Sequence, residues 1–548
     1  MTSDANDTSD VDVLVVGAGP TGLALAAFLA ADGVPFRIID RQSDAVHESR
    51  ALAIQPRTLE MLAGLGVSDT LLGLGNRAVR LQMHVQRRVI GVPLFDLGLD
   101  DTAYPFLLFV SQEATERVLG DHLAAAGVRL ERGVELAGLA QDSDVVSCRL
   151  VHRGGHEEMV RARYVVGCDG AHSMVRRGSG IAFEGSSYPQ TFVLADLEAD
   201  GIQPGAAHVF ISADGMLFFF PLGHPATWRM LAMRPRADTT PVTDPVTMPE
   251  VQELSDAHTG ALVRLRDPVW MTNFRLANRG AAHYRADRVF LAGDAAHIHS
   301  PAGAQGMNTG IQDAANLAWK LALVTGGPGP LTVLDSYEAE RAPVGRAVLR
   351  FTNRAFTIAT ASSPVLRFVR GQLVPRVLPL ALRFTTGRAV AFRTVSQLGI
   401  RYRSSPLCVD GAGAPRRGPR AGDRLPDGPV TVEGRRSTIQ RSVAAPGFHL
   451  LLCGPLAAWP DDATAALSER YRRHITVHRL SRDVGPRVLH DPSGLVLRRL
   501  GLTGTRSAHL LVRPDGYLGY RGGIDVTGLG AHLAAEYGLV GIGYLSAP

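Results

Sequence analysis

The chain has 548 residues, of which 45% are hydrophobic and 20% are charged, a composition typical of a folded protein with two or three domains. Its net charge of +5 does not indicate a nucleic-acid-binding surface, because its basic residues, all arginine except Lys320, do not cluster with aromatic residues. Four scattered cysteines, an acidic N-terminus and the lack of a long apolar run argue against a disulfide scaffold, a secretion signal and a membrane span, so a cytoplasmic protein is expected.

The first predicted element is a buried strand over Val11–Val16, followed by a glycine-rich turn, a helix that ends near Gly33 and a second strand over Pro35–Ile39. The turn has the pattern GxGxxG, whose first glycine permits a tight turn, whose second lets a pyrophosphate approach and whose third lets the helix pack on the strand. An acid that accepts from a ribose hydroxyl is expected about 20 residues later, at the end of the second strand. The residues predicted to bind a dinucleotide are Gly17, Gly19, Pro20, Thr21, Gly22, Asp40 and Arg41.

Two later strands, Tyr164–Val166 and Val289–Ala292, also end at glycine-containing turns, which predicts a doubly wound α/β domain assembled from separate segments. Alternating apolar residues between them predict an inserted antiparallel sheet. A segment rich in glycine, proline and arginine, 410–429, is interpreted as a linker. We therefore expect a nucleotide-binding domain (1–185 and 281–400), an inserted sheet domain (186–280) and a C-terminal α/β unit (401–548).

The two later turns identify the dinucleotide. The segments RYVVGCDGAHSMVR (163–176) and LAGDAAHIHSPAGAQGMN (291–308) resemble the DG and GD motifs of the group A FAD-dependent aromatic monooxygenases, the p-hydroxybenzoate hydroxylase-like family. The resemblance implies FAD as cofactor, with O₂, an aromatic small molecule and NAD(P)H as substrates. It also implies that NAD(P)H binds transiently in a groove, because the sequence holds no second GxGxxG turn.

The resemblance assigns roles to individual positions. Asp294 would accept from the ribityl chain, Gln112 would contact FAD, and Val134 would lie beside the adenine. A helix starting near Met307 would direct its positive end at the reduced flavin, which is an anion. In the DG motif, Asp169, Ser173 and Arg176 would hold the flavin or the nicotinamide phosphates, although a surface ion pair is an equal alternative for Arg176. The residues expected around the isoalloxazine ring are Arg50, Pro301, Gly303, Gly306, Met307 and Asn308, of which Arg50, Pro301 and Gly303 form the predicted catalytic centre.

Substrate contacts are predicted from one strand-like run. Phe218, Phe220 and Pro221 resemble the residues that roof the substrate cavity in this family, and Trp228 would add an apolar wall, with ordinary core packing as the alternative for each. His297 and His299 lack a third ligand nearby, so no metal site is predicted.

The last unit resembles the thioredoxin-like appendage of the phenol and polyketide hydroxylases, through the segments 419–427 and 511–521. Cys453 has no second cysteine three positions along, so the unit is expected to be structural, with a homodimer surface as its candidate role. The resemblance implies hydroxylation of a polycyclic polyketide-type ring through a C4a-hydroperoxyflavin. A Baeyer–Villiger oxygenase and an antibiotic-inactivating or antibiotic-sequestering flavoprotein are the alternatives.

Overall fold

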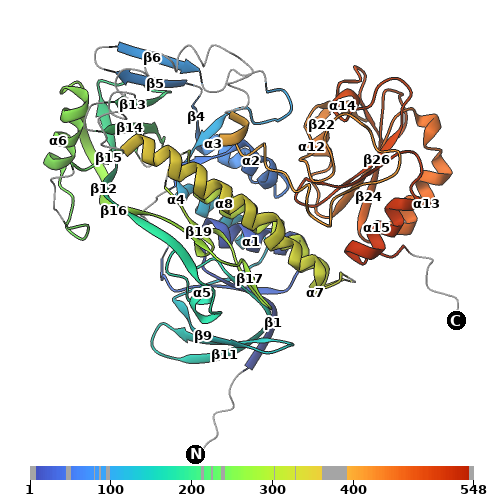
Figure 1. The fold of residues 1–548 in the computed structure, drawn as a ribbon, viewed down its shortest axis with the longest axis horizontal. Helices are drawn as coiled ribbons and strands as arrows, with labels where there is room; N and C mark the ends of the chain where they lie inside the picture. Colours follow the sequence, from blue (N-terminus) through green and yellow to red (C-terminus); the bar gives the residue numbers. More distant parts are fainter. Residues whose placement is uncertain are drawn as a thin grey trace, which may run out of the picture.

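The computed structural model describes residues 8–44, 51–78, 80–85, 88–93, 99–211, 215–223, 226–235, 241–300, 303–327, 329–360 and 392–541. Figure 1 shows a nucleotide-binding unit near the N-terminus, a second sheet at the far end and a C-terminal unit in orange and red beside them. The long helix α8 (Thr332–Thr360) runs across the middle of the molecule. No helix among the described residues has the length and apolar character needed to cross a membrane.

The nucleotide-binding sheet has the order β17-β18-β11-β1-β2-β8, and its four central pairings are parallel. The strands that the sequence predicts over 11–16, 35–39, 164–166 and 289–292 are its neighbours β1, β2, β11 and β18. In register, Val16 lies beside Gly167 and Gly167 beside Leu291, so all three predicted motifs begin at one edge of the sheet. Its strands are β1 (Thr8–Val16), β2 (Phe36–Asp40), β8 (Leu130–Arg132), β9 (Val134–Gln141), β10 (Val146–His152), β11 (Glu157–Gly167), β17 (Arg285–Ala286) and β18 (Val289–Leu291).

Helix α1 packs on β1 and β2, and the short helix α5 packs on β11 and β18, so the central strands of this sheet are apolar. Helix α1 packs on α4 and α7, and α7 packs on α8. A three-stranded sheet, β3-β7-β4, lies near α2 and α3 in the chain. These elements are α1 (Pro20–Ala31), β3 (Ala53–Ile54), α2 (Pro56–Ala63), α3 (Ser68–Leu74), β4 (Asn76–Ala78), β7 (Leu107–Phe109), α4 (Gln112–Ala125), α5 (Met174–Gly178), η1 (Gly293–Ala295) and α7 (Gly306–Thr325).

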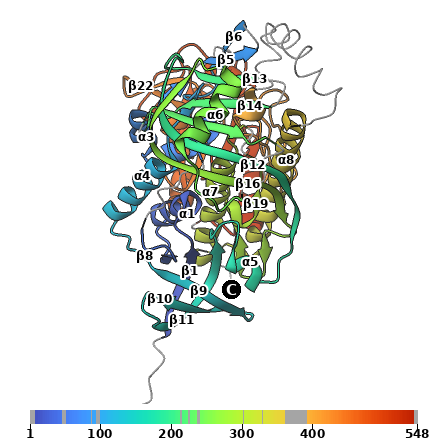
Figure 2. The same ribbon diagram turned by 90° about the vertical axis from the view of Figure 1, so that its left-hand side faces the viewer.

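The second sheet has eight strands in the order β19-β16-β12-β15-β14-β13-β5-β6, and Figure 2 shows it beside α6. All its pairings are antiparallel except β13 with β5. Strands β5 and β6 come from residues 80–93, ahead of the predicted insertion. Its elements are β5 (Arg80–Val85), β6 (Arg88–Pro93), β12 (Phe183–Asp200), β13 (Ala207–Ile211), β14 (Met216–Pro221), β15 (Trp228–Met233), α6 (Met248–Thr259), β16 (Arg264–Ala281) and β19 (His297–Ile298).

The C-terminal unit is built on a third sheet, β20-β27-β26-β23-β24-β25-β21-β22. The segment 410–429, interpreted above as a linker, is packed against this unit: Ala421 and Leu425 are buried, and the Leu425 amide donates to the Gly516 carbonyl. The unit comprises β20 (Val409–Asp410), β21 (Pro429–Val432), β22 (Arg435–Thr438), α12 (Ile439–Ser442), β23 (Phe448–Cys453), η3 (Leu456–Ala458), α13 (Asp461–Tyr471), β24 (Ile475–Ser481), β25 (Val488–His490), α14 (Leu495–Arg499), β26 (Ala508–Val512), β27 (Leu518–Gly522) and α15 (Thr527–Tyr537).

Candidate cofactor site and active-site cavity

The glycine-rich turn between β1 and α1 has the shape of a phosphate-binding turn. Gly17 has a φ of +103°, and a Cβ there would lie 2.5 Å from the Cys168 carbonyl oxygen. A Cβ on Gly22 would lie 1.9 Å from the Gly17 carbonyl oxygen, whereas a Cβ on Gly19 would meet nothing within 4 Å. Gly17 and Gly22 therefore allow close backbone packing, and the open side of Gly19 leaves room for a ligand. Helix α1 has no side-chain cap, so its first N–H groups can bind a pyrophosphate.

Two adjoining cavities open at this turn. The smaller cavity, of about 250 Å³, is lined by residues that include Asp40, Arg41, Glu116 and Val134. The larger cavity, of about 810 Å³, is lined by residues that include Pro20, Thr21, Asp294, Gly306 and Met307. Gly19 and Gln112 line both. A dinucleotide with its pyrophosphate at Gly19 would fit this arrangement, with the adenosine in the smaller cavity and the flavin in the larger one.

Two acids shape the smaller cavity. The Asp40 carboxylate accepts from the backbone N–H groups of Ala18, at 2.6 Å, and Gln42, at 2.8 Å, so it lies directly against the glycine-rich turn. Glu116 is buried and accepts from Gln112 Nε2 at 2.8 Å. Burial raises the pKa of Glu116 to about 7, so this carboxyl group carries a proton in part of the molecules at neutral pH.

The DG segment connects the other two motifs. Asp169 Oδ2 accepts from the backbone N–H groups of Met174, at 2.6 Å, and Val175, at 3.1 Å, and Ser173 Oγ accepts from the Arg176 N–H, so both side chains cap α5. Arg176 is buried and donates to the Ala295 carbonyl at 2.7 Å. This bond ties the DG segment to the GD segment, so Arg176 is not a surface ion-pair residue.

Asn308 holds the start of α7 against a second segment. It is fully buried, its Oδ1 accepts from the Gln55 N–H at 2.7 Å, and its Nδ2 donates to the Ala53 carbonyl at 2.8 Å. Ala51, which lines the larger cavity, is fixed in turn: its N–H donates to Gln112, and its carbonyl accepts from Arg229 at 2.9 Å. The segment 51–55 is thus held by α4, α7 and the second sheet together. Arg50 and Pro301 lie outside the described residues.

The second sheet supplies an apolar wall to the larger cavity, through Leu194, Leu231, Phe274 and Leu276. Successive side chains on a strand point to opposite faces, so Trp228 and Leu231 are separated. Trp228 packs in the core against Phe219. Neither Trp228 nor Pro221, its partner on the neighbouring strand, lines either cavity. Phe218 and Phe220 stack on each other, on the face that carries Leu231, without lining the cavity. Strands β12, β15 and β16 therefore form the apolar wall of the cavity, and Phe218 and Phe220 lie on the same face of the sheet.

Basic side chains gather at the same cavity. Arg177, Arg275 and Arg279 are exposed and line it together with His172. Burial lowers the pKa of Arg176, and the nearby Arg177 and Arg279 lower it further against the opposing effect of Asp169. An anionic ligand is favoured at this rim.

His299 also lines the larger cavity. Its Nδ1 donates to the Ser300 carbonyl at 2.9 Å, and its buried Nε2 has no hydrogen-bond partner among the described residues. Burial lowers the pKa of His299 to about 4, so the ring is neutral at pH 7. Within the described ranges, no three metal-ligating side chains come together.

A buried charged centre connects the GD turn to the rest of the protein. Asp313 on α7 accepts from the Gly293 N–H at 3.1 Å and from His297 Nε2 at 2.7 Å. Its other oxygen accepts from Arg341 Nε at 2.6 Å, and Arg341 NH1 donates to the Tyr402 hydroxyl at 2.9 Å. The backbone next to Asp294 is therefore fixed by residues that lie outside every recognised motif.

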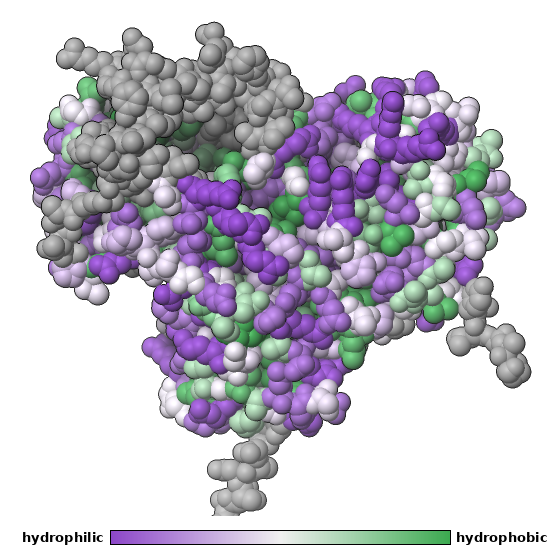
Figure 3. All heavy atoms as spheres, viewed as in Figure 1, coloured by the Kyte–Doolittle hydropathy of each residue, from purple (hydrophilic) through white to green (hydrophobic). Residues whose placement is uncertain are grey.

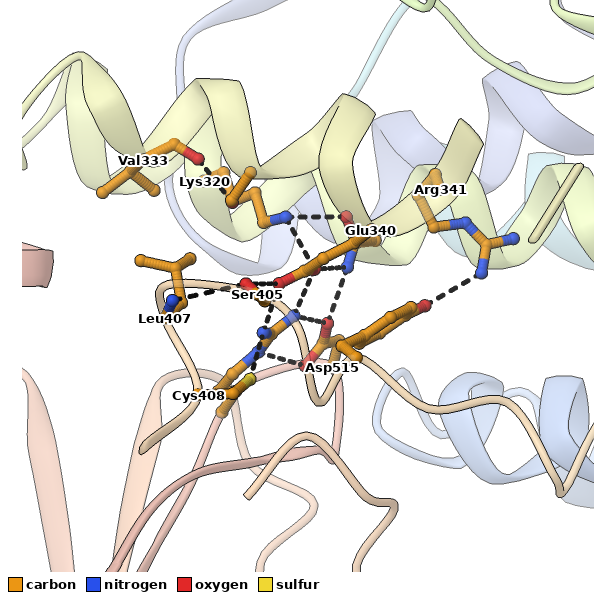
Figure 4. A network of polar contacts seen from close by, with 12 residues as sticks. Lys320, Val333, Glu340, Arg341, Ser405, Leu407, Cys408 and Asp515 are labelled. Carbon is orange, nitrogen blue, oxygen red and sulfur yellow. Dashed lines mark hydrogen bonds and ion pairs between the residues drawn. The ribbon is translucent and has the colours of Figure 1, made fainter. Parts of the chain in front are cut away.

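A second buried cluster joins α7 and α8 to the C-terminal unit (Figure 4). Both Glu340 oxygens accept from Arg513, at 2.7 and 2.8 Å, and one also accepts from Lys320 at 2.9 Å. Arg513 donates in addition to Asp515 at 2.6 Å. All four side chains are fully buried, and two positive charges balance two negative ones. The outer surface is different: in Figure 3, hydrophilic and hydrophobic residues are interspersed over the described part of the visible face.

Comparisons with known proteins agree with this geometry. A family model described as "FAD binding domain" matches residues 10–352. The chain is 35% identical over 527 residues to 6-methylpretetramide 4-monooxygenase of Streptomyces rimosus, covering 93% of this chain and 90% of that one. It is 35% identical over 402 residues to rifampicin monooxygenase of Streptomyces venezuelae, covering 71% and 79%. The crystal structure of aklavinone-11 hydroxylase with FAD and aklavinone matches with a TM-score of 0.78 and 26% identity, over 96% of this chain and 98% of that one.

Proposed function

Because this chain belongs to the FAD-binding-domain family of flavin-dependent aromatic monooxygenases, we propose that it hydroxylates a polycyclic aromatic compound of the polyketide class with O₂ and a reduced nicotinamide. The observation that carries this proposal is the 810 Å³ cavity, where the glycine-rich turn and the start of α7 meet an apolar sheet face that includes Leu194 and Leu231. The relatives named above act on 6-methylpretetramide, rifampicin and aklavinone, which supports a large ring system as substrate.

When bound, FAD would supply the redox chemistry, which is two-electron transfer from the nicotinamide and transfer of one atom of O₂ to the ring, with the other atom released as water. The residues of the chain bind and orient. Gly19 and the start of α1 would hold the pyrophosphate, and Asp294 would accept from the ribityl hydroxyls. The N-terminal end of α7 at Gly306 would stabilise negative charge on the reduced ring. Phe274 and the neighbouring apolar side chains would exclude water.

We place the NAD(P)H phosphates at the basic rim of the same cavity. Arg177, Arg275 and Arg279 are exposed there and can pair with phosphate oxygens. The sequence holds no second GxGxxG turn that could bind a second dinucleotide. With its phosphates at this rim, NAD(P)H would reach the flavin only while no other ligand occupies the rim.

We also infer that the C-terminal unit is thioredoxin-like and structural. Its central strand β23 is parallel to β24, with α13 between them in the chain, and antiparallel to β26. Cys453 at the end of β23 is fully buried, and burial raises the pKa of its thiol well above the usual range. A thiol in this state does not support disulfide exchange.

The test is NAD(P)H oxidation and O₂ uptake by the holoenzyme with a panel of polycyclic phenols. Hydroxylation is expected to give a phenolic product that carries one atom of isotopically labelled O₂. A labelled lactone would indicate Baeyer–Villiger insertion instead. Tight binding of a compound without faster NAD(P)H oxidation would indicate a sequestering flavoprotein and would overturn the proposal.

A further inference from the structure

The short loop that leads into α7 has a strained backbone. Gly303 has a φ of +81° and Ala304 a φ of +52°, so two consecutive residues adopt the left-handed conformation. For alanine this conformation is unfavourable, because its Cβ lies too close to the following carbonyl oxygen. Ala304 and Gln305 line the 810 Å³ cavity beside Gly306. Such strain persists only where the surrounding structure imposes it, and it is often found at functional sites.

Side-chain amides impose the shape of this loop. Gln55 Nε2 donates to the Gly303 carbonyl at 2.8 Å, and Asn308 Nδ2 donates to the Ala304 carbonyl at 2.8 Å. Gln305 Nε2 donates to the same Gly303 carbonyl at 3.1 Å and to the Val395 carbonyl at 2.7 Å. The carbonyls of both left-handed residues are thus held by amide donors, and the Gln305 side chain is part of this support.

Gln397 holds the Gln305 side chain from a distant part of the chain. Its Nε2 donates to Gln305 Oε1 at 2.5 Å and to Thr309 Oγ1 at 2.9 Å, and its Oε1 accepts from Gln312. The side chain is 2% exposed, so these bonds are not shared with solvent. Gln397 itself has a φ of +60°, a second strained non-glycine residue beside the same loop. One amide therefore connects the loop with the first two turns of α7.

We propose that Gln397 is a positioning residue for the flavin: by orienting Gln305, it keeps Gly303 and Ala304 in the left-handed shape that the cofactor requires. Gln397 belongs to none of the three sequence motifs and lies 89 positions or more from each of them in the chain. The proposal rests on FAD occupying the larger cavity. It does not depend on the identity of the aromatic substrate.

The test is a fluorescence titration of FAD into the apoprotein of Gln397→Met, which keeps the side-chain length and removes the amide. We expect FAD to bind about tenfold more weakly, equivalent to about 1.4 kcal/mol. Adding Ala304→Gly should restore most of the affinity, because glycine adopts a positive φ without the penalty that alanine has. The control variant described next separates this effect from a general loss of stability.

The matched control is Gln252→Met on α6. The Gln252 amide also makes three hydrogen bonds, to Asp256, Val263 and Leu265, but it lines neither cavity. This variant should lose stability and keep the wild-type affinity for FAD.

Should Gln397→Met fail to fold, Gln397→Asn provides the same test, because asparagine tolerates the left-handed backbone while its amide is one methylene shorter than the Gln305 contact needs. The same tenfold weakening is expected. Wild-type FAD affinity in the folded variant, or a Gln397→Met loss that Ala304→Gly does not reduce, would overturn the proposal. The titration contains neither nicotinamide nor substrate, so its result is independent of whether the enzyme hydroxylates an aromatic ring.

Discussion

Replacing Glu340 by glutamine should separate the C-terminal unit from the flavin-binding part of the enzyme. Glu340 is fully buried and accepts five hydrogen bonds, of which two come from Arg513 and one from Lys320. The wild-type cluster is neutral, with Lys320 and Arg513 opposed by Glu340 and Asp515. Glu340→Gln leaves one buried positive charge without a counter-charge. Breaking a buried ion pair in this way is unfavourable by about 3–5 kcal/mol.

The same charge count predicts how the loss can be reversed. Lys320→Met in the Glu340→Gln background restores neutrality, because Arg513 and Asp515 still pair, so the double variant should recover at least half of the lost stability. Alkaline pH should act in the same direction. Burial already lowers the pKa of Lys320 to about 8, and loss of Glu340 removes an interaction that raises it, so Lys320 can release its proton more easily. The Glu340→Gln defect should therefore be smaller at pH 9 than at pH 7.

Limited proteolysis in the 410–429 segment measures this separation, because Arg424 in this segment also bonds to Glu60 and Asp101 of the flavin-binding part. Cleavage follows the population of the opened form when opening is rapid. A loss of 3 kcal/mol corresponds to roughly a hundredfold faster cleavage. Global unfolding is less suited, since a chain of several domains does not unfold in one step. If the double variant were cleaved faster than Glu340→Gln alone, the charge-balance reasoning would be refuted.

Three further predictions concern single side chains, and a fourth concerns the reaction itself. Asp294→Ala should weaken FAD binding about ten- to a hundredfold, or about 1.5–3 kcal/mol, in a fluorescence titration, and unchanged affinity would exclude the ribityl contact. Burial raises the folded pKa of Glu116 from 4.5 to about 7, so the native protein keeps a proton that the unfolded chain releases, and stability is lost as pH rises through this range. Glu116→Gln should thus raise the melting temperature more at pH 8 than at pH 5, and equal gains would count against the assignment. Burial lowers the folded pKa of His84 from 6.5 to about 4, so the free energy of unfolding falls as pH drops from 6.5 to 4. Urea titrations across this range should show that His84→Gln reduces the number of protons taken up on unfolding by about one. Finally, an aromatic substrate should accelerate flavin reduction by NAD(P)H at least tenfold in stopped-flow measurements, about 1.4 kcal/mol of barrier, whereas equal rates would reject substrate-gated reduction.

The three motifs could be predicted from the sequence because each is local. Gly17, Gly19 and Gly22 are set by the turn between one strand and one helix, so their spacing alone indicates a dinucleotide site. The family resemblance then identified FAD. Arg177 and His172, which lie beside the DG motif, could also have been found, since exposed basic residues next to a phosphate site are a recognisable signal.

The residues that fix the shape of the site left no such signal. Gln397 acts through Gln305, 92 positions away, and Arg229 reaches Ala51 over 178 positions, so only the folded chain shows these contacts. The FFFPL run is apolar on both faces, so its sequence does not indicate which residues face the cavity. In the fold, Phe218 and Phe220 share the face that carries Leu231, whereas Trp228 packs in the core.

The two buried polar centres connect the C-terminal unit to α7, α8 and the GD turn. Tyr402 bonds to Arg341, Arg341 to Asp313, and Asp313 to the backbone of Gly293, next to the predicted ribityl ligand. A bound FAD that favours this arrangement must also favour docking of the segment that carries Tyr402. Coupling between two binding equilibria is reciprocal, so the factor by which docking of the C-terminal unit strengthens FAD binding equals the factor by which FAD strengthens docking. Proteolysis rates of the apo and holo forms measure this factor, and equal rates would show that the polar centres support only the local structure around them.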